Sequence, residues 1–306
     1  MNVSLIIPTY NKKTRLAIML QSIRRLKYDK DLEIIIVNDG SNDGTQKLVE
    51  DFCQNVKLGD GMHIKLISTS NQGRSKARNV GIKVAGGELL IFTDDDLILS
   101  DTFVINHVKE HLALDTAVVH GQILSLPQLK FLENPATGQQ YDGTLASERM
   151  RQYCITPDMF GEGSIHHYLQ HNSRIGKFEK DIRALFEHTS VHDSYIRWIG
   201  FTGGNVSIRK KNIPMGNLFD PAMGKIWGCE DLEAGYRLFL NGMKFLYAPA
   251  ACNYHMNHFR ETSVSEHRAS FKYFYDKHRN KAIKQLEKYF DKDISTLLEW
   301  KKSLNE

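Results

Sequence analysis

The sequence has 306 residues, 41% of them hydrophobic, and a formal net charge of +4. This length allows one large domain or two small ones, and the apolar fraction suffices for a sizeable core and argues against disorder. The positive excess is concentrated in residues 265–290. Such a distribution does not fit a duplex-DNA binder, and we expect no nucleic-acid partner. A disulfide framework or zinc cluster is not expected either, because no CxxC pair occurs among the cysteines, which are Cys53, Cys154, Cys229 and Cys252.

The first residues, MNVSLIIPTYN, have a short apolar run with no basic region before it. We interpret this run as a first strand and not as a signal peptide. No segment approaches the roughly 20 apolar residues that a membrane-spanning helix needs. We therefore expect a cytoplasmic protein, with peripheral contact at the inner face of the membrane as an alternative that stays open.

The first 120 residues alternate short apolar runs with helical patterns. Such βαβα alternation predicts a parallel sheet with helices on both faces. Strands are expected at Val3–Ile7, Leu32–Val37, Ile64–Ile67, Leu89–Phe92 and Ala117–His120. Helices are expected around Leu16–Ile23, at Asp43–Phe52, at Ala77–Val84 and over residues 101–114.

This rhythm breaks after residue 122. Residues 123–195 are richer in polar and aromatic side chains and are interrupted by prolines, so we expect helices and long loops there. From about residue 265 to the end, apolar residues near helical spacing predict one amphipathic basic helix or a pair. Between these segments, regular elements are expected as a strand at Gly203–Ile208, a helix at Asp231–Asn241 and a strand at Lys244–Tyr247.

An acidic run, Asp94-Asp95-Asp96, follows the apolar stretch Leu89–Phe92. Three adjacent carboxylates cannot lie in a dry core without paired cations, because burying each charge costs several kcal/mol. At the carboxyl end of a strand they project into the crevice where open α/β sheets bind ligands, and there they can hold a divalent cation. Taken alone, the run fits an acidic turn before a helix equally well.

Two further motifs follow the first two expected strands. After the first, Pro8-Thr9-Tyr10 offers polar contacts and a flat face for a base, although an ordinary turn capped by Asn11 has the same pattern. After the second, Asp39 lies in a glycine-rich loop and is well placed to bind a ribose or a base edge. The alternative is a loop in which Asp43 caps the next helix.

A third motif, Asn71–Asn79, places Arg74, Lys76 and Arg78 around a helix start, which suits a phosphate ligand. A solvated basic face is the alternative. The chain has no GxGxxG after its first strand and no GxxxxGK[ST], which argues against a dinucleotide site and a P-loop.

A fourth motif, Trp227–Glu233, places the acidic pair Glu230 and Asp231 at an expected helix start. Such a pair can supply a general base, although acids also stabilise a helix start through its dipole. His255 and His258 follow shortly afterwards. A lone histidine is more often structural, but two carboxylates alone would leave a metal site short of protein ligands.

The ordered set IIPTYN, VNDGSNDGT, NQGRSKARNVGI, FTDDD, TGGNVSIRK and WGCEDLEAGYRL, followed by a later histidine, resembles family 2 glycosyltransferases of the GT-A fold. The resemblance covers roughly residues 1–260. The segment Gly203–Gly242 also resembles galactosyl- and N-acetylgalactosaminyltransferases, including bacterial chondroitin-polymerase-type domains. Residues 123–195 and 262–306 match no pattern of this kind.

The resemblance implies an α/β GT-A fold, with a Rossmann-like, mostly parallel sheet flanked by helices. It implies a nucleotide-sugar-binding half at 1–122 and an acceptor-binding, catalytic half at 123–260. Residues 261–306 then form a basic amphipathic tail.

The resemblance also implies residue roles. Asp231 is the expected catalytic base, with Glu230 as the next candidate, and Mn²⁺ or Mg²⁺ is expected on Asp96 and His255 with help from Asp94. Asp95 departs from the family pattern, since the middle residue of the motif is itself acidic, and this leaves open which carboxylates bind metal. Contacts to the nucleotide-sugar are expected from Pro8, Thr9, Tyr10, Asp39, Arg78, Asp94 and Asp95. Contacts to the acceptor or donor sugar are expected from Gly203, Gly204, Asn205 and Trp227.

These roles predict a metal-dependent, inverting transfer of a hexose or N-acetylhexosamine from a UDP-sugar. The acceptor stays open between a glycan end, a lipid-linked intermediate, a peptide and a small metabolite. A sugar nucleotidyltransferase or pyrophosphorylase is less well supported, because PTYNKK lacks the glycines such enzymes carry after strand one. An inactive glycan- or nucleotide-binding homologue is disfavoured by the joint presence of the acidic run, Asp231 and His255.

Two segments carry separate expectations. The insert 123–195 should lie over the acceptor side, with structural or acceptor-contact roles rather than metal binding for His166, His167 and His171. The tail should dock its aromatic stripe on the body or on a second subunit, which would make a homodimer; the stripe consists of Phe271, Phe274, Tyr275 and Phe290. The alternative is a helix lying on an anionic leaflet near a lipid-linked acceptor.

Overall fold

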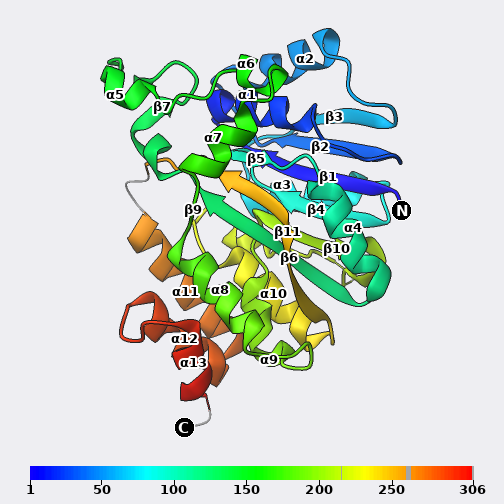
Figure 1. Cartoon of the computed structure of the whole chain (residues 1–306). Coiled ribbons are helices and arrows are strands. Elements are labelled where there is room, and N and C mark those ends of the chain that lie inside the picture. Colours follow the sequence, from blue (N-terminus) through cyan, green and yellow to red (C-terminus); the bar gives the residue numbers. More distant parts are fainter. Residues whose placement is uncertain (215, 260–262, 305–306) are drawn as a thin grey trace.

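The computed structural model describes residues 1–214, 216–259 and 263–304 (Figure 1). Nine of the described strands form one sheet in the order β3-β2-β1-β4-β10-β6-β11-β5, with β9 paired to β6. Strands β7 and β8 form a separate hairpin. The strands are β1 Val3–Thr9, β2 Leu32–Asn38, β3 Met62–Ser68, β4 Leu89–Thr93, β5 Leu97–Leu99, β6 Ala117–Ser125, β7 Leu132–Asn134, β8 Gln139–Gln140, β9 Arg174–Ile175, β10 Asn205–Arg209 and β11 Lys244–His255.

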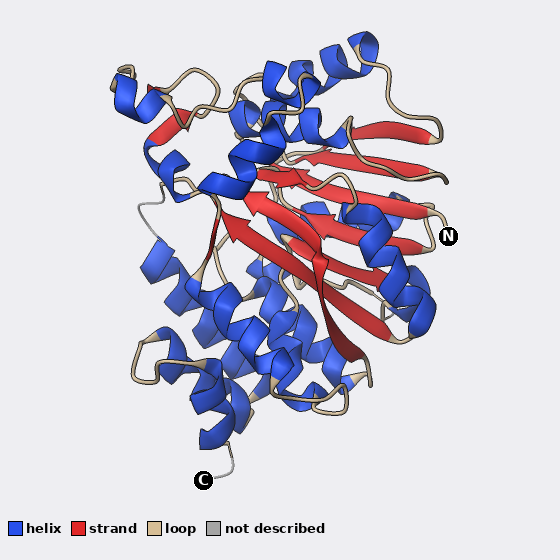
Figure 2. Ribbon diagram, in the orientation of Figure 1, coloured by secondary structure: helices blue, strands red, loops and turns tan. Residues whose placement is uncertain are grey.

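Helices cover both faces of this sheet (Figure 2). Helices α1, α2 and α4 pack on one face, while α3, α8, α10 and the tail helices share a core on the other. The helices are α1 Lys13–Ile23, α2 Thr45–Asn55, α3 Arg74–Val84, α4 Phe103–Ala113, α5 Glu148–Arg151, α6 Asp158–Gly161, α7 Ile165–Asn172, α8 Lys177–Glu187, α9 Ser194–Arg197, α10 Glu230–Leu240, α11 Ser263–His278, α12 Lys281–Phe290 and α13 Leu297–Ser303.

The amino-terminal half is the parallel part of the sheet. Strands β3, β2, β1 and β4 pair in parallel. Strands β1, β2 and β4 are buried along almost their whole length, as expected of apolar runs covered on both faces. The expected βαβα order is confirmed here. The loops after β1, β2, β3 and β4, which carry Tyr10, Asp39, the start of Asn71–Asn79 and the acidic run, therefore meet at one edge of the sheet.

The second half makes the sheet mixed. Strand β10 lies antiparallel between β4 and β6, and β11 runs parallel to β6. Strand β11 extends to His255, well beyond the expected Lys244–Tyr247. The register of β11 against β6 shifts between Ala248 and Asn253, and Pro249 lies in this irregular stretch. Proline is tolerated at such irregularities within a strand. The far end of β11 pairs with the short β5.

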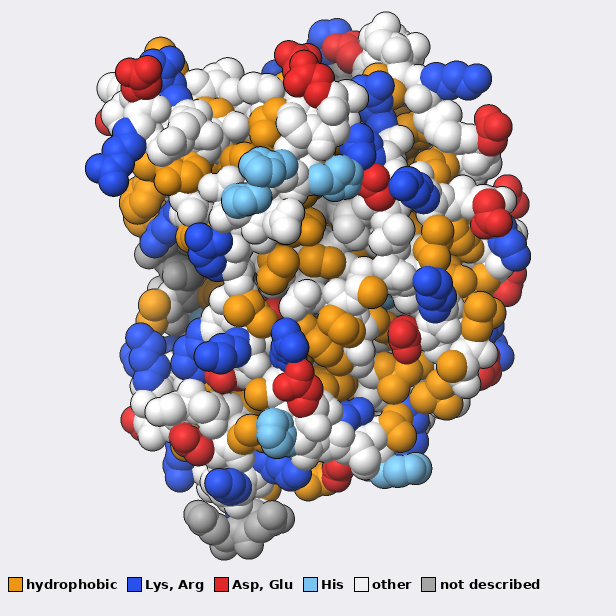
Figure 3. All heavy atoms as spheres, viewed as in Figure 1, with side chains coloured by type: hydrophobic (Ala, Val, Ile, Leu, Met, Phe, Trp, Pro, Cys, Tyr) orange, Lys and Arg blue, Asp and Glu red, His pale blue; other side chains and the backbone are white. Residues whose placement is uncertain are grey.

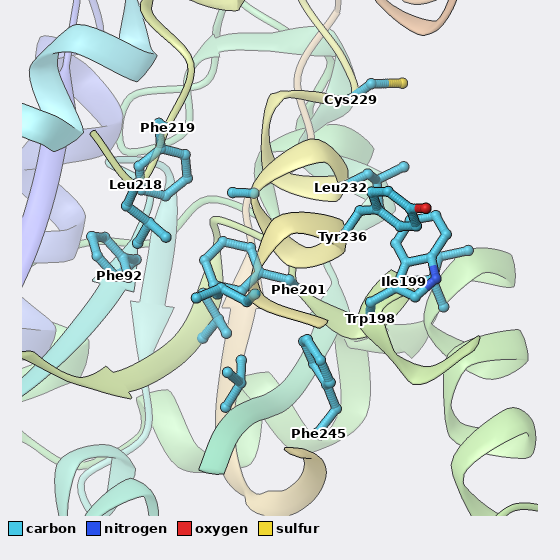
Figure 4. Packing of buried hydrophobic residues seen from close by; sticks show 14 of the residues in the cluster. Phe92, Trp198, Ile199, Phe201, Leu218, Phe219, Cys229, Leu232, Tyr236 and Phe245 are labelled. Atoms are coloured by element: carbon cyan, nitrogen blue, oxygen red, sulfur yellow. The ribbon is translucent and has the colours of Figure 1, made fainter. Parts of the chain in front are cut away.

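The carboxy-terminal tail forms three described helices, where one or two were expected, and its apolar side chains join the main core. Trp198 anchors this core with its indole against Tyr236, Phe274 and Trp300. Figure 4 shows the neighbouring cluster around Trp198, Phe201 and Tyr236. Phe271 and Phe274 of the stripe are buried in the main core, so the stripe is docked on the body of the same chain. The tail lysines at 272, 277, 281, 284 and 288 are exposed. The expected boundary between 260 and 261 lies outside the described residues.

An ion cluster fixes the tail to α10. The buried Glu233 pairs with Lys277 at 2.8 Å and with His278 at 2.9 Å, and Arg237 also contacts it. Burial alone would raise the pKa of Glu233, but hydrogen bonds from His278 and Arg237 outweigh it and hold the pKa at about 2. Glu233 therefore stays ionised and ties α11 to α10 at neutral pH.

Phe274→Ala should lower the free energy of unfolding by about 3–5 kcal/mol, because it removes a fully buried ring between Trp198 and Tyr236. The matched control is Lys272→Ala, an exposed neighbour on the same helix, which should stay within about 0.5 kcal/mol. Urea unfolding followed by circular dichroism measures both. Equal effects of the two changes would contradict docking of the stripe on the body.

Candidate active site

Asp39 joins two of the loops at the carboxyl edge of the sheet. It is buried, and its carboxylate accepts hydrogen bonds from the backbone N–H of Gln72 at 2.9 Å and of Gly73 at 2.7 Å. It thereby holds the loop after β2 against the start of α3. Pro8 and Thr9 are buried at the end of β1, whereas Tyr10 is half exposed beside them. Contacts of these four residues with a nucleotide stay predictions.

Arg78 lies at the centre of a buried charge network. Its guanidinium donates to Asp94 Oδ1 at 2.7 Å and to Glu230 Oε1 at 3.3 Å, and only 2% of the residue is exposed. A Cβ on Gly203 would lie 2.5 Å from Arg78 Nη2, so a larger residue here would displace the buried guanidinium. The structure thus pairs Arg78 with two carboxylates. Arg74, which also reaches Glu230 at 3.5 Å, is the more exposed of the two arginines.

The acidic pair at the start of α10 divides into two environments. Glu230 is buried, and burial together with the charge of Asp231 raises its pKa, against the opposing effect of Arg74 and Arg78. Asp231 is only half buried, and its carboxylate accepts the backbone N–H of Gly203 at 3.2 Å and of Leu232 at 2.8 Å. Of the two acids, Asp231 is therefore the one that an incoming substrate can reach.

Asp96, His255 and His258 form a candidate metal centre, with one ligand atom from each lying within 4.8 Å of the others. Pairing of β5 with β11 sets Leu97 opposite His255 and so brings Asp96 beside the two imidazoles. Asp96 Oδ2 lies 3.1 Å from His258 Nε2 and 3.5 Å from His255 Nε2. Burial would raise the pKa of Asp96, but the two histidines hold it well below its ordinary value.

This donor set fits a divalent cation. One carboxylate oxygen and two imidazole nitrogens suit Mn²⁺ better than Mg²⁺, which prefers oxygen ligands throughout. The structure adds His258 to the expected pair of Asp96 and His255. Asp94 lies outside this cluster, since its Oδ1 accepts from Arg78.

The remaining acid of the run, Asp95, is buried. Burial and the charge of Asp96 raise its pKa to about 7. A contact of Asp95 with the donor stays a prediction.

The residues expected to contact sugars differ in accessibility. Gly204 lies beside Asp94, since a Cβ there would be 3.3 Å from Asp94 Oδ2. Trp227 is half buried, with its ring 5.7 Å from that of His267. Asn205 is fully buried, and its amide donates to the carbonyl oxygens of Gln122 and Ala251. These contacts give Asn205 a structural part behind the site, and its contact with a sugar stays a prediction.

Two buried histidines support the strand that carries Asn205. His107 Nε2 lies 2.8 Å from Asn205 Oδ1, and His111 Nε2 lies 2.8 Å from Ser207 Oγ. Burial lowers the pKa of His107 to about 3 and that of His111 to about 4. Both are therefore neutral in the folded protein over the whole physiological range.

These two histidines predict loss of stability in acid. Below pH 6.5 the unfolded chain binds protons on both residues and the folded protein does not, so stability falls as the pH drops from about 6.5 toward 4. Each histidine should cost roughly 2 kcal/mol between pH 8 and pH 5. Urea midpoints at pH 8, 6.5 and 5 measure this loss, and His111→Gln should remove about half of it. A midpoint independent of pH, or the same loss in the variant, would contradict the assignment.

Arg15 is a buried residue that sequence reasoning missed and that fixes a segment next to the candidate metal centre. It lies on the apolar side of α1, is buried, and its guanidinium donates to the carbonyl oxygens of Leu132, Glu133 and Met256 at 2.7, 3.0 and 3.2 Å. It thereby joins the base of the β7–β8 hairpin to the segment that carries His258. The one sequence signal is a cation inside the apolar periodicity of Leu16 and Met19.

The insert is arranged around this hairpin and α7. Tyr141 in the hairpin and Phe259 after His258 are 46% and 50% exposed, with ring centroids 6.3 Å apart. Histidine side chains gather over α7 in Figure 3. Of these, His167 and His171 have ring centroids 4.0 Å apart, and His166 lies 3.4 Å from Asp101. In the described part of the chain, the one group with metal-ligand geometry is the Asp96 cluster.

No helix among the described residues is both long and apolar enough to cross a bilayer.

Solved structures with this architecture define the fold class. TarS 1–349 of S. aureus in complex with UDP matches with a TM-score of 0.58 at 16% identity, over 95% of this chain and 72% of that one. The mannosyltransferase PcManGT from Pyrobaculum calidifontis, in complex with GDP-Man and Mn²⁺, matches with a TM-score of 0.51 at 18% identity, over 83% of this chain and 56% of that one. The fold is that of GT-A glycosyltransferases, as the sequence predicts.

The chain belongs to glycosyl transferase family 2, whose family model matches residues 4–177. It is 27% identical over 295 residues to the uncharacterized glycosyltransferase YfnE of Bacillus subtilis, covering 92% of this chain and 71% of that protein. It is 28% identical over 261 residues to chondroitin synthase of Escherichia coli, covering 82% of this chain. The chain spans about a third of that synthase. The protein is therefore a transferase enzyme.

Proposed function

We propose that the protein is a metal-dependent, inverting glycosyltransferase that moves a hexose or N-acetylhexosamine from a UDP-sugar to an acceptor hydroxyl. One observation carries this proposal. Asp231 accepts the N–H of Gly203, Gly203 lies so near Arg78 that a Cβ there would be 2.5 Å from Nη2, and Arg78 binds Asp94, two residues from the metal candidate Asp96. This arrangement supports a base and a cation site at the same edge of the sheet. The UDP bound to TarS and the Mn²⁺ bound to PcManGT support the choice of donor and cofactor.

The chain's own residues would divide the chemistry between two sites. A divalent cation held by Asp96, His255 and His258 would neutralise charge on the departing diphosphate. Asp231 would take the proton from the acceptor hydroxyl as that oxygen attacks the anomeric carbon. The N–H groups of Gly203 and Leu232 fix the orientation of its carboxylate. A single displacement of this kind inverts the anomeric centre.

The network around Arg78 would hold the candidate base and the candidate metal centre at a fixed distance from each other. Arg78 neutralises Glu230, so that the acid next to Asp231 adds little negative charge near the base. The same guanidinium holds Asp94 beside Gly204, where a donor sugar would lie. Arg74, whose side chain is 30% exposed, also reaches Glu230 at 3.5 Å and is a candidate for contact with a phosphate.

The acceptor side is proposed to be the β7–β8 hairpin and the segment after β11. Tyr141 and Phe259 expose aromatic surface directly after the metal candidate His258, and their rings are held together by a bond from Phe259 N–H to Tyr141 Oη at 3.3 Å. Aromatic faces of this kind bury apolar area of a partner while leaving its polar groups in water. Among the four acceptor classes, they favour a saccharide ring.

A donor panel tests the proposed function. Purified protein with Mn²⁺ is given UDP-Glc, UDP-Gal, UDP-GlcNAc, UDP-GalNAc and GDP-Man, with and without a set of p-nitrophenyl glycosides as acceptors. UDP release from one UDP-sugar is expected, and NMR should show that the anomeric configuration is inverted in the product. Release of pyrophosphate from UTP and a sugar 1-phosphate would identify a nucleotidyltransferase instead. UDP binding without turnover of any donor would identify a binding homologue.

A further inference from the structure

We propose that His267 and Ser270, two residues on helix α11 of the tail, are positioning residues for Asp231. The proposal rests on the proposed function, because it takes Asp231 as the base. It assigns a role to a segment that lies outside the family resemblance found in the sequence.

The loop before Asp231 has a backbone conformation that needs outside support. Gly228 has φ +116° and Cys229 has φ +37°, so two successive residues lie in the left-handed region. A non-glycine residue there is uncommon and persists where its surroundings hold it. A Cβ on Gly228 would lie 2.9 Å from the His267 ring, so α11 closes on the loop at this point.

Helix α11 supplies that support through two side chains. Ser270 is buried, and its hydroxyl donates to the carbonyl oxygen of Gly228 at 3.0 Å. His267 Nε2 lies 3.6 Å from Cys229 Sγ, and its ring is 5.7 Å from that of Trp227. On its other side the imidazole packs 4.6 Å from the ring of Phe290 on α12. His267 is thus wedged between the loop and the rest of the tail.

A second anchor lies just after the base. Glu233, two residues beyond Asp231, pairs with Lys277 and His278 near the other end of α11. Asp231 therefore stands between two points that are both fixed to the same helix. A displacement of about 1 Å at a reacting group can cost on the order of a hundredfold in rate. Loosening α11 at Ser270 or His267 should therefore impair catalysis without touching the donor site.

The first test uses Ser270→Ala and His267→Ala, with Tyr273→Phe as the matched control. Tyr273 Oη donates to Asp220 Oδ2 at 3.1 Å, so the control removes a bond that ties the same helix to a different segment. We expect kcat for transfer of the donor found in the panel to fall about 10- to 100-fold in both loop variants and to stay within about twofold in the control. UDP affinity and thermal midpoint report whether the fold and the donor site are intact.

Tryptophan fluorescence reports on the packing of the loop around Trp227, and this measurement needs no substrate. Trp198 and Trp300 are fully buried, so quenching by acrylamide reports mainly on Trp227. His267→Ala should raise the quenching constant roughly twofold, because it uncovers one face of the indole, and Tyr273→Phe should leave it unchanged. Equal quenching constants in the wild type, His267→Ala and Tyr273→Phe would overturn the packing of His267 on Trp227, on which the proposal rests.

A double-mutant cycle with Asp231→Asn decides whether the loss acts through the base. If Ser270 positions Asp231, Ser270→Ala should cost little further activity in the Asp231→Asn background, since residues that act as a unit are not additive. Full additivity, or unchanged kcat in Ser270→Ala, would overturn the proposal. Full activity of Asp231→Asn alone would instead overturn the assigned base, so the two failures are distinguishable. Ser270→Ala removes one oxygen atom and keeps the test open if His267→Ala does not fold.

Discussion

Asp231→Asn is expected to lower transfer to the acceptor by about two to four orders of magnitude. The amide keeps the volume of the carboxylate, but its single oxygen can accept only one of the two N–H bonds that Asp231 accepts from Gly203 and Leu232. It cannot accept a proton from the attacking hydroxyl at neutral pH. Affinity for UDP should change little, because the described hydrogen bonds of Asp231 come from Gly203 and Leu232, and neither is among the residues expected to contact the nucleotide. Steady-state transfer and calorimetric titration of UDP measure the two quantities separately.

Glu230→Gln is the matched comparison, since Glu230 is the adjacent acid with the opposite environment. It is buried and paired with Arg74 and Arg78, so its replacement should lower the thermal midpoint more than Asp231→Asn does. If Asp231→Asn retained more than about a tenth of wild-type transfer with chemistry rate-limiting, Asp231 would not be the base. A large loss in Glu230→Gln with unchanged stability would then move that role to Glu230.

The sequence predicts the amino-terminal half of the fold well, for a physical reason. Leu32–Val37 and Leu89–Phe92 are short apolar runs buried on both faces. The first is followed by helix α2, and the second by the short strand β5 and then helix α4. Local pattern and tertiary burial agree there. The pairing of β10 with β4 joins residues more than a hundred positions apart, and Pro249 masks the true length of β11. Neither the β10–β4 pairing nor the length of β11 produces a periodic pattern in the nearby sequence.

The residues of the candidate site also fall into those that sequence motifs predict and those that only the fold brings together. Asp96, Asp231 and His255 follow from motifs, because each stands beside an element whose end is visible in the sequence. Three further features depend on contacts between distant segments: the closeness of His258 to Asp96, the buried position of Arg15, and the pairing of Arg78 with two carboxylates. The three cations of Asn71–Asn79 predict phosphate binding as a group, but only the folded chain separates Arg78 from the more exposed Arg74.

Asp96→Ala should weaken the binding of UDP in the presence of Mn²⁺ by more than about tenfold, and EDTA should do the same to the wild type. Asp96 is the single carboxylate of the cluster, and its removal leaves two imidazoles with no anionic ligand. Titration calorimetry gives the affinity for UDP, and the electron paramagnetic resonance signal of free Mn²⁺ gives the bound metal directly. Asp51→Ala, a half-buried aspartate on α2 that pairs with Lys47, is the control and should behave as the wild type.

The two histidines extend this test, because the sequence predicts one as a ligand and the structure adds the other. His258 lies closer to Asp96 than His255 does, and its side chain is far more buried. If both bind the cation, His255→Ala and His258→Ala should each lower Mn²⁺ binding and the metal-dependent part of UDP affinity. If His258 only orients Asp96 by a hydrogen bond, His258→Gln should retain metal binding that His255→Gln loses. UDP affinity that is the same in EDTA, in Asp96→Ala and in both histidine variants would exclude a metal ion from the donor site altogether.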